Sequence, residues 1–312
     1  MMTSVQEIAD IVIEKCMAMK RSEKVLIIYD KTTDEIASAL HISAELRSDD
    51  VMMIKIKPTG EHGAEPPAVV AKAMREADVV ICPTKYSLTH TSARKLASKR
   101  GVRVVTMPGI TNEMFLRAVN VDYDEVTELN GKIAKLMREA KAVRITSSSG
   151  TDFHFKNEGA RTIEDDTGIF RTKGIYGNLP AGEVFTAPLE KTGAGVIVID
   201  QMGGECAPKT KALVRNGAVQ DIEGDPAFRK KMWKHKNARM IAEFGIGTNP
   251  KAALTGNVLE DEKVKGTCHV AFGSNFDFGG KIRASVHWDA IIIAPTIWFD
   301  EKKIMESGEF LI

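Results

Sequence analysis

The second half of the sequence contains a histidine and an aspartate at the spacing of two metal ligands. His287 and Asp289 lie in the segment SVHWD, which has the character of a β-strand. Side chains at positions i and i+2 of a strand leave the same face, about 7 Å apart at the backbone. An imidazole and a carboxylate on one face can hold a divalent cation. They can also pair with each other or satisfy a turn, and this pair alone is consistent with both interpretations.

Three further polar residues sit in apolar segments. His269 belongs to the β-type segment TCHVAF, Glu243 to MIAEFGIG, and Glu183 is the only charge in GNLPAGEVFTAP. A lone histidine in such a strand is more often a satisfied core residue. A Glu in apolar surroundings needs a cation, a hydrogen-bond cluster or a raised pKa. Because this situation occurs twice, with His287 and Asp289 nearby in the sequence, we predict one metal site shared by all these residues.

The charges of this predicted cluster favour two metal ions over one. Its three carboxylates are negative, whereas neutral imidazoles add no charge. One divalent ion would leave carboxylates to spare, but two such ions and a bridging hydroxide would balance the cluster. Nitrogen and oxygen ligands without a thiolate suit zinc, cobalt or manganese. Such a pair of ions is a known arrangement for hydrolysing amides and phosphates.

The first half of the sequence shows the elements of a parallel α/β sheet. Short apolar runs typical of buried strands alternate with helical patterns of about ten to fifteen residues, which is the signature of βαβ units. The predicted strands are Lys24 to Tyr29, Val51 to Lys57, Asp78 to Pro83 and Val102 to Met107. The predicted helices are Val5 to Met19, Thr33 to Leu46, Ala68 to Ala77, Thr91 to Lys99 and Asp124 to Ala140. We therefore expect an open Rossmann-like α/β domain over residues 1–140.

The pattern changes after residue 141, where short β-type runs alternate with turn signals. Asn216-Gly217, between two such runs, is the strongest hairpin signal in the chain. The helical candidates here are Asp225 to Lys236 and Ala252 to Thr255. We predict a mainly antiparallel β (α+β) metal-binding catalytic domain over residues 141–312. The fold class is thus α/β, with a parallel domain followed by a β-rich one.

Composition excludes several classes of protein. The chain has 312 residues, with 43 Lys and Arg against 42 Asp and Glu, so we expect neither nucleic acid nor a membrane surface as a partner. No apolar run is long enough for a membrane-spanning helix, and acidic residues interrupt the N-terminal segment where a signal peptide would be apolar. We expect a cytoplasmic protein. Phosphate-binding glycine loops and the G-x-S-x-G and H-E-x-x-H motifs are missing from the sequence.

Four ordered segments resemble the M29 family of metallo-aminopeptidases, the aminopeptidase T or thermophilic type. They are NLPAGEVFTAP, AEFGIGTNP, DEKVKGTCHVAFG and SVHWD, and the chain would be a short member. The resemblance implies a dinuclear site with the ligands Glu183, Glu243, His269, His287 and Asp289. It also implies an exopeptidase that removes N-terminal residues from peptides with activated water, with Glu183 or Glu243 as general base. A homodimer that takes a small peptide or another small molecule is the expected assembly.

Two alternatives remain open at this point. The M29 family has a tyrosine seven residues after the first histidine, where this chain has Phe276, and a phenyl ring cannot donate a hydrogen bond to an oxyanion. The chain could therefore be a metal-binding protein with weakened catalysis. Phe276 itself is a weak candidate for substrate binding. The sequence also resembles non-haem iron dioxygenases that open dihydroxypyridine rings. In that case His269, His287 and Asp289 would bind one Fe(II) as a 2-His-1-carboxylate triad.

A loop in the first half is a weaker candidate for substrate binding. The segment TKYSLTHT, which contains Thr84 and His90, follows the predicted strand Asp78 to Pro83. In open α/β sheets ligands bind beyond the carboxyl ends of the strands. The hydroxyls, the lysine and His90 could hold a substrate, although a capped helix start is the more common meaning of such a segment.

Overall fold

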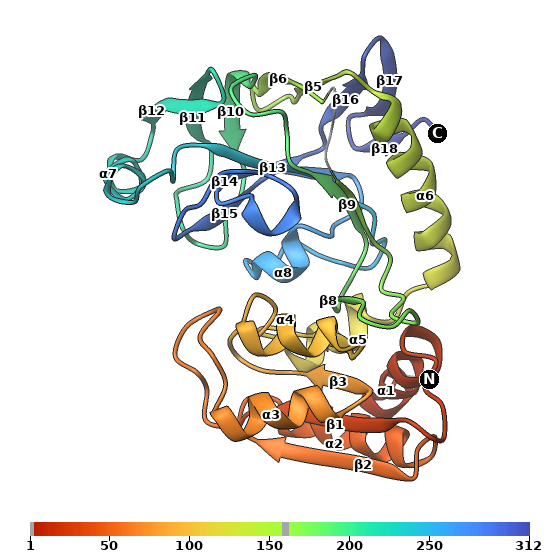
Figure 1. The fold of residues 1–312 in the computed structure, drawn as a ribbon. Coiled ribbons are helices and arrows are strands. Elements are labelled where there is room, and N and C mark those ends of the chain that lie inside the picture. The colour runs from red at the N-terminus through yellow and green to blue at the C-terminus, as the bar shows by residue number, and fades with distance from the viewer. Residues whose placement is uncertain (1–2, 158–161) are drawn as a thin grey trace. The chain divides into compact units, whose positions relative to one another are not determined.

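The computed structural model describes residues 3–157 and 162–312. The chain divides into two compact units. The first comprises residues 1–124 and 166–181, and the second comprises residues 125–165 and 182–312. The predicted α/β class is confirmed, with a parallel sheet in the N-terminal part and antiparallel sheets in the C-terminal part (Figure 1).

The first unit is built on a parallel sheet with the strand order β2-β1-β3-β4-β8. Its strands are β1 (Lys24–Tyr29), β2 (Asp50–Lys55), β3 (Val79–Cys82), β4 (Arg103–Thr106) and β8 (Tyr176–Asn178). Its helices are α1 (Val5–Ile11), which continues as the π-helical turn η1 (Val12–Cys16), α2 (Asp34–Glu45), α3 (Ala68–Glu76), α4 (Ser92–Lys99) and α5 (Asn112–Ala118). α3 and α4 pack together, as do α1, α2 and α5, so helices cover both faces of the sheet.

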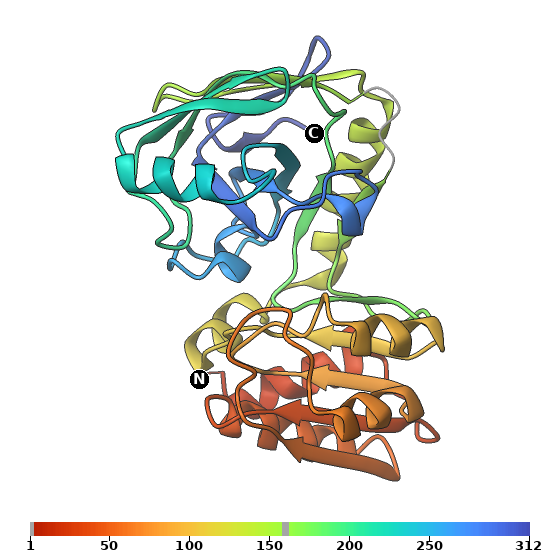
Figure 2. The ribbon, with the colours of Figure 1, turned by 60° about the vertical axis from the view of Figure 1, so that its left-hand side comes forward.

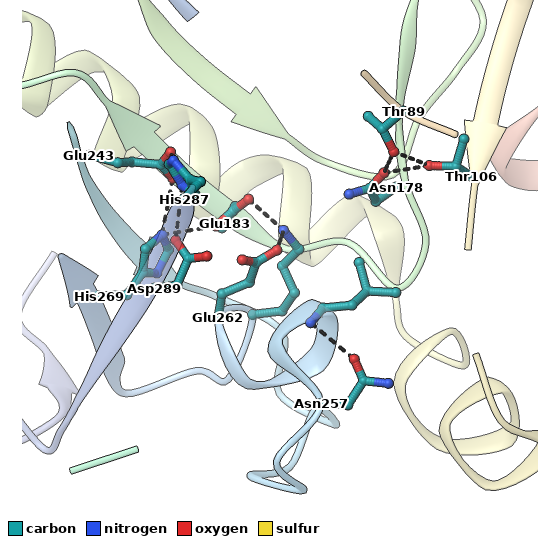
Figure 3. Close-up of polar contacts among 12 residues, drawn as sticks. Thr89, Thr106, Asn178, Glu183, Glu243, Asn257, Glu262, His269, His287 and Asp289 are labelled. Carbon is teal, nitrogen blue, oxygen red and sulfur yellow. Dashed lines mark hydrogen bonds and ion pairs between the residues drawn. The ribbon is translucent and has the colours of Figure 1, made fainter. Parts of the chain in front are cut away.

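Buried apolar residues explain why the central strands of this sheet form. Every residue of β3 and β4 is buried, as expected for parallel strands covered on both faces. A cluster of side chains joins β8 to its neighbour: Asn178 Oδ1 accepts hydrogen bonds from Thr106 Oγ1 at 2.7 Å and from Thr89 Oγ1 at 3.1 Å (Figure 3). This cluster fastens an edge strand that comes from a distant part of the sequence.

The second unit contains two antiparallel sheets. One has the order β12-β11-β10-β6-β5-β16-β17-β18 and the other β15-β14-β13-β9-β7. The strands of the first are β5 (Ala142–Thr146), β6 (Asp152–Lys156), β10 (Ala194–Ile199), β11 (Thr210–Arg215), β12 (Ala218–Glu223), β16 (Thr296–Phe299), β17 (Lys302–Glu306) and β18 (Glu309–Phe310). Those of the second are β7 (Ile163–Asp166), β9 (Glu183–Thr186), β13 (Ile241–Gly247), β14 (Thr267–Gly273) and β15 (His287–Ile293).

One hydrophobic core lies between these two sheets. Phe155 of β6 contacts Phe244 of β13 with ring centroids 5.3 Å apart, and both belong to the same buried cluster. Ile133 and Met137 of α6 (Tyr123–Glu139) join this cluster, and Figures 1 and 2 show α6 running along one side of the unit. The remaining helices are α7 (Pro226–Lys234), α8 (Val258–Asp261) and the 3-10 turn η2 (Phe276–Phe278).

The predicted helix at Ala252 to Thr255 is wrong, since these residues form an irregular loop. Side chains rather than carbonyls receive the backbone N–H groups of this segment. Asn249 Oδ1 accepts from the N–H of Ala252 at 2.9 Å, and Asp261 Oδ1 accepts from the N–H of Thr255 at 2.7 Å. Buried polar side chains compete with helical hydrogen bonding in this way. The helical turn of this region is α8, which begins after Asn257.

None of the helices in the described ranges is both long and apolar enough to span a bilayer.

Candidate metal centre

Four neighbouring strands place the five predicted ligands on one face of the second unit's smaller sheet. The residues directly opposite each other across these strands are Gly247 and Glu183, Gly245 and His269, Ala271 and Asp289, and Gly273 and His287. Because side chains alternate along a strand, these residues share one face. Val184, Phe244 and Val270 alternate with them and point into the core instead. One sheet face is therefore apolar and packed, and the other carries the polar cluster.

The polar atoms of this cluster converge (Figure 3). His269 Nε2 lies 3.2 Å from Glu243 Oε1 and 3.5 Å from Glu183 Oε2. His287 Nε2 lies 3.3 Å from Glu243 Oε2 and 3.2 Å from Asp289 Oδ1. Glu243 is thus the central member, with one oxygen toward each imidazole.

In the part of the chain that the structure describes, the ligand atoms form two groups of three. One is Glu183, Glu243 and His269, the other is Glu243, His287 and Asp289, and the atoms within each group lie within 4.8 Å of one another. His269 is fully buried and the three carboxylates are 5 to 6% exposed, whereas the side chain of His287 is 32% exposed. Solvent and small molecules therefore reach the cluster at His287.

Unsatisfied polar atoms in the cluster fit a metal ion. Glu183 Oε2, Asp289 Oδ1 and His269 Nδ1 are buried and lack a hydrogen-bond partner among the described residues. Asp289 Oδ1 lies 3.2 Å from His287 Nε2 but makes no hydrogen bond with it. A buried carboxylate oxygen without a donor is costly, and a cation bound here would satisfy it. The prediction of a buried cluster of histidines and carboxylates able to bind metal is confirmed.

The electrostatics of the metal-free cluster favour charged imidazoles. Burial alone would lower the pKa of His269, but the hydrogen bond with Glu243 and the charges of Glu183, Glu243 and Asp289 outweigh it and raise this pKa to about 9. The pKa of His287 is raised well above its usual value against the same effect of burial, chiefly by Asp289 and Glu243. Burial would raise the pKa of Glu243, but the hydrogen bonds and charges of the two imidazoles outweigh it and lower this pKa. A metal ion must displace these protons to bind.

Two contacts orient the imidazole rings. His287 Nδ1 lies 2.8 Å from the carbonyl oxygen of Ser274. A carbonyl can only accept, so Nδ1 carries the proton and Nε2 is left to bind a cation. A Cβ on Gly245 would lie 2.2 Å from ring atoms of His269, so the absence of a side chain at Gly245 makes room for this ring.

Sequence reasoning missed a buried lysine next to the cluster. Lys263, which is 1% exposed, donates from Nζ to Glu183 Oε1 and, at 2.7 Å, to Glu262 Oε1. Burial, more than any other effect, raises the pKa of Glu262 to about 8. The charged text EDEK in the sequence resembles a solvated turn, so no local signal indicates that its lysine is buried.

An aromatic wall beside His287 was also missed. The ring of Phe278 in η2 meets the His287 ring edge-on, with centroids 5.8 Å apart, and the ring of Phe185 at 5.7 Å. Asn275 closes the loop that holds Phe278, because its Oδ1 accepts from the N–H of Ile282 at 2.7 Å. The accessible side of the cluster is thus lined by aromatic side chains.

The three weaker candidates for substrate binding are not among the residues of the metal cluster. Phe276 is 43% exposed and packs against the guanidinium of Arg283, 3.1 Å from the ring centroid. Thr84 belongs to the first unit, where it is buried and donates to the carbonyl of Tyr86 at 2.8 Å. His90 is an exposed residue of the same unit. Their role in substrate binding remains a prediction.

Comparison with known proteins identifies the family. Residues 5–312 match the family NicX, 2,5-dihydroxypyridine 5,6-dioxygenase. The chain belongs to the NicX family. A solved structure of 2,5-dihydroxypyridine dioxygenase from Pseudomonas putida KT2440 is 19% identical, with a TM-score of 0.83 over 98% of this chain and 96% of that one. Wild-type AmpT from Thermus thermophilus is 16% identical, with a TM-score of 0.73 over 99% of both chains. No curated protein sequence matches the chain.

Membership of the NicX family corrects three predictions from the sequence. The identification as an M29 aminopeptidase is wrong, and so are the hydrolase class and the peptidase activity, because the family match over residues 5–312 is to dioxygenases. AmpT shares the fold. Histidines and carboxylates on one sheet face serve both chemistries, so the ligand residues alone do not separate them.

Proposed function

We propose that this chain is a ring-cleaving dioxygenase that opens a dihydroxylated pyridine, or a ring of the same chemical class, with one Fe(II) ion. The proposed ligands are His269 and His287, with Asp289 as the carboxylate. Two histidines and one carboxylate are the ligands of many non-haem Fe(II) oxygenases. When bound, Fe(II) would supply the redox chemistry for the reaction of O2 with the dihydroxylated ring.

The observation that carries this proposal is the full-length family match together with the position of the three ligands on adjacent strands. β14 carries His269, β15 carries His287 and Asp289, and all three side chains point to the same face. The aromatic wall of Phe278 and Phe185 next to His287 suits an aromatic substrate.

Glu243 is the residue best placed to accept a hydrogen bond from the substrate. Its two oxygens lie 3.2 and 3.3 Å from the imidazoles of His269 and His287. Because its pKa is lowered, Glu243 stays ionised, and we assign it the role of accepting a hydrogen bond from a ring hydroxyl of the substrate. Ser274 fixes the tautomer of His287 through its carbonyl oxygen, and Gly245 leaves room for the ring of His269.

Oxygen consumption tests the proposed function. The protein is loaded anaerobically with one equivalent of Fe(II) and mixed with 2,5-dihydroxypyridine in air-saturated buffer. An oxygen electrode should record one O2 consumed for each ring lost from the ultraviolet spectrum. His269→Ala and His287→Ala should consume none, because each removes a ligand.

The control is His154→Ala, which changes an exposed histidine of β6 outside the cluster and should keep full activity. The proposal fails if the iron-loaded wild-type protein consumes no O2 with 2,5-dihydroxypyridine or with the isomeric dihydroxybenzenes.

A further inference from the structure

Lys263 is a buried cation inside the cluster of carboxylates. Its Nζ donates to Glu183 and to Glu262, and its side chain is 1% exposed. An ammonium group buried to this extent is normally paired with carboxylates. Here it is paired with Glu183, a carboxylate that also belongs to one of the two groups of potential metal ligands.

The fold holds the backbone of Lys263 directly against the sheet. A Cβ on Gly247 would lie 2.8 Å from the carbonyl carbon of Lys263 and 2.2 Å from the carbonyl oxygen of Val264, so only a glycine in β13 permits this approach. The carbonyl of Lys263 accepts from the N–H of Asn249 at 2.9 Å.

The helical turn that precedes Lys263 is also fixed. The N–H of Lys263 donates to the carbonyl of Glu260 at 2.9 Å. The carboxylates of Glu260 and Asp261 are fully buried and accept from the N–H groups of Ala253 and Thr255. The backbone of Lys263 is therefore fixed on both sides, and its buried Nζ is held by hydrogen bonds to Glu183 and Glu262.

Of the two groups of potential metal ligands, only the one that contains Glu183 is in contact with Lys263. Among the described residues, the group of Glu243, His287 and Asp289 makes its ion pairs between imidazole and carboxylate, and no lysine takes part in them. In the other group, Oε1 of Glu183 is engaged by the ammonium, and only Oε2 faces His269. A dication bound there would lose a carboxylate oxygen and would lie beside a positive charge. Like charges at such separations repel strongly where water is excluded.

We propose that Lys263 takes the place of a second metal ion beside Glu183, so that His269, His287 and Asp289 hold one divalent ion and the cluster does not bind two. Lys263 is in this view a positioning residue: it holds Glu183 and supplies a positive charge that a dinuclear centre would draw from its second ion. One dication and the ammonium of Lys263 together balance the three carboxylates among the candidate ligands, because the raised pKa of Glu262 leaves its carboxyl group largely protonated at neutral pH. The inference rests on the proposed function in that it explains why one Fe(II) is enough.

The test counts bound ions with Zn²⁺ alone as the probe. Equilibrium dialysis followed by elemental analysis gives the number of ions per chain for the wild type, Lys263→Met, Lys263→Ala and Lys263→Arg. We expect one ion for the wild type and for Lys263→Arg, which keeps the charge. We expect two for Lys263→Ala and Lys263→Met, with affinity for a second ion raised at least about tenfold. Lys265→Met, at an exposed position two residues away, is the matched control and should bind one ion.

Two results would overturn the inference. One is a wild-type chain that binds two ions with comparable affinity. This result does not depend on whether any variant folds. The other is a count of one ion in both neutral variants, once circular dichroism shows them folded. A merely structural role for Lys263 would change stability and leave the count at one.

The number of bound ions tests the role of Lys263, and the oxygen assay tests the proposed function, so either can be disproved without the other. A wild-type count of one that becomes two in the neutral variants supports the inference even if dihydroxypyridines are not cleaved, which would overturn only the proposed function. Ring cleavage by a wild-type protein with two bound ions would overturn the role of Lys263 and leave the dioxygenase activity standing.

Discussion

Phe278 lies beside His287, the most exposed of the candidate ligands. Its ring is half-buried, edge-on to His287, and contacts Phe185. A contact between two aromatic rings contributes about 0.5 to 1.5 kcal/mol beyond the area that it buries. Phe278 is therefore expected to contribute to binding of the ring and to leave the ligands themselves in place.

Phe278→Ala should raise KM for 2,5-dihydroxypyridine about tenfold, which corresponds to about 1.4 kcal/mol, and should change kcat less. Steady-state oxygen consumption measures both constants. Phe276→Ala is the comparison, in which we expect a smaller effect because this ring lies two residues away, 43% exposed and against Arg283. An equal effect of both substitutions would mean that the aromatic wall does not select the substrate.

The candidate ligands could be predicted from single residues, but their neighbours could not. Glu183 and Glu243 are conspicuous because each is a charge in an apolar segment. Lys263 stands in a charged segment and resembles a surface residue until Gly247 and Asn249 bring its backbone onto β13. Its burial depends on contacts across the sheet, which a local pattern does not contain.

At the scale of elements, the position of the His269 ring between β13 and β14 depends on Gly245. This glycine lies opposite His269 in the register, and a methyl group there would overlap the imidazole at 2.2 Å. The clash is with a packed ring, so the ring must move away from Glu243 if a side chain is added.

Gly245→Ala should therefore weaken metal binding about 10- to 100-fold, the range seen when the surroundings of a ligand are disturbed. Isothermal titration with Zn²⁺ measures the affinity. Gly131→Ala is the control, since this residue lies in α6 with no heavy atom within 4 Å of the added carbon. That change should leave the affinity unaltered and stabilise the helix by up to about 1 kcal/mol. An unchanged affinity in Gly245→Ala would show that the ring of His269 has another usable position.

The elements of the fold were accessible from the sequence to different degrees. The strands from β1 to β4 are continuous apolar runs, and β1 was predicted with its observed bounds, Lys24–Tyr29. The hairpin at Asn216 forms because Asn216 and Gly217 both adopt positive φ, of 52° and 68°. The loop 252–255 failed as a helix because Asp261 and Asn249 take its N–H groups, and such partners are invisible in a window of a few residues.

At the scale of the whole molecule, the chain passes between its two units more than once. Residues 166–181 belong to the first unit, where β8 joins the edge of the parallel sheet. The short strand is held by Asn178 and by pairing with β4. Three residues of weak β pattern carry too little signal to predict, so this return became visible only in three dimensions.

All three tryptophans, Trp233, Trp288 and Trp298, belong to the second unit. Tryptophan fluorescence therefore reports unfolding of the unit that contains the metal cluster. A ligand that binds only the folded state stabilises it, by about 2.7 kcal/mol at a hundredfold excess over Kd. For a unit of this size, that shifts the fluorescence midpoint upward by roughly 5 to 10 °C, and a chelator should reverse the shift.

The size of this metal-induced shift should increase with pH. The pKa of His269 is about 9 in the folded, metal-free protein and 6.5 when unperturbed. A group with a raised pKa stabilises the folded state fully below 6.5, and this contribution is lost as the pH rises toward 9. At about 1.4 kcal/mol per pKa unit, the metal-free protein loses on the order of 2 kcal/mol between pH 6 and pH 8. Bound Zn²⁺ must displace the same proton, so its stabilisation grows over that interval. Melting curves measured with and without Zn²⁺ should therefore lie further apart at pH 8 than at pH 6 for the wild type. For His287→Ala, which lacks a ligand, the curves with and without Zn²⁺ should coincide at either pH. A shift that is larger at pH 6 than at pH 8 would contradict the protonated cluster.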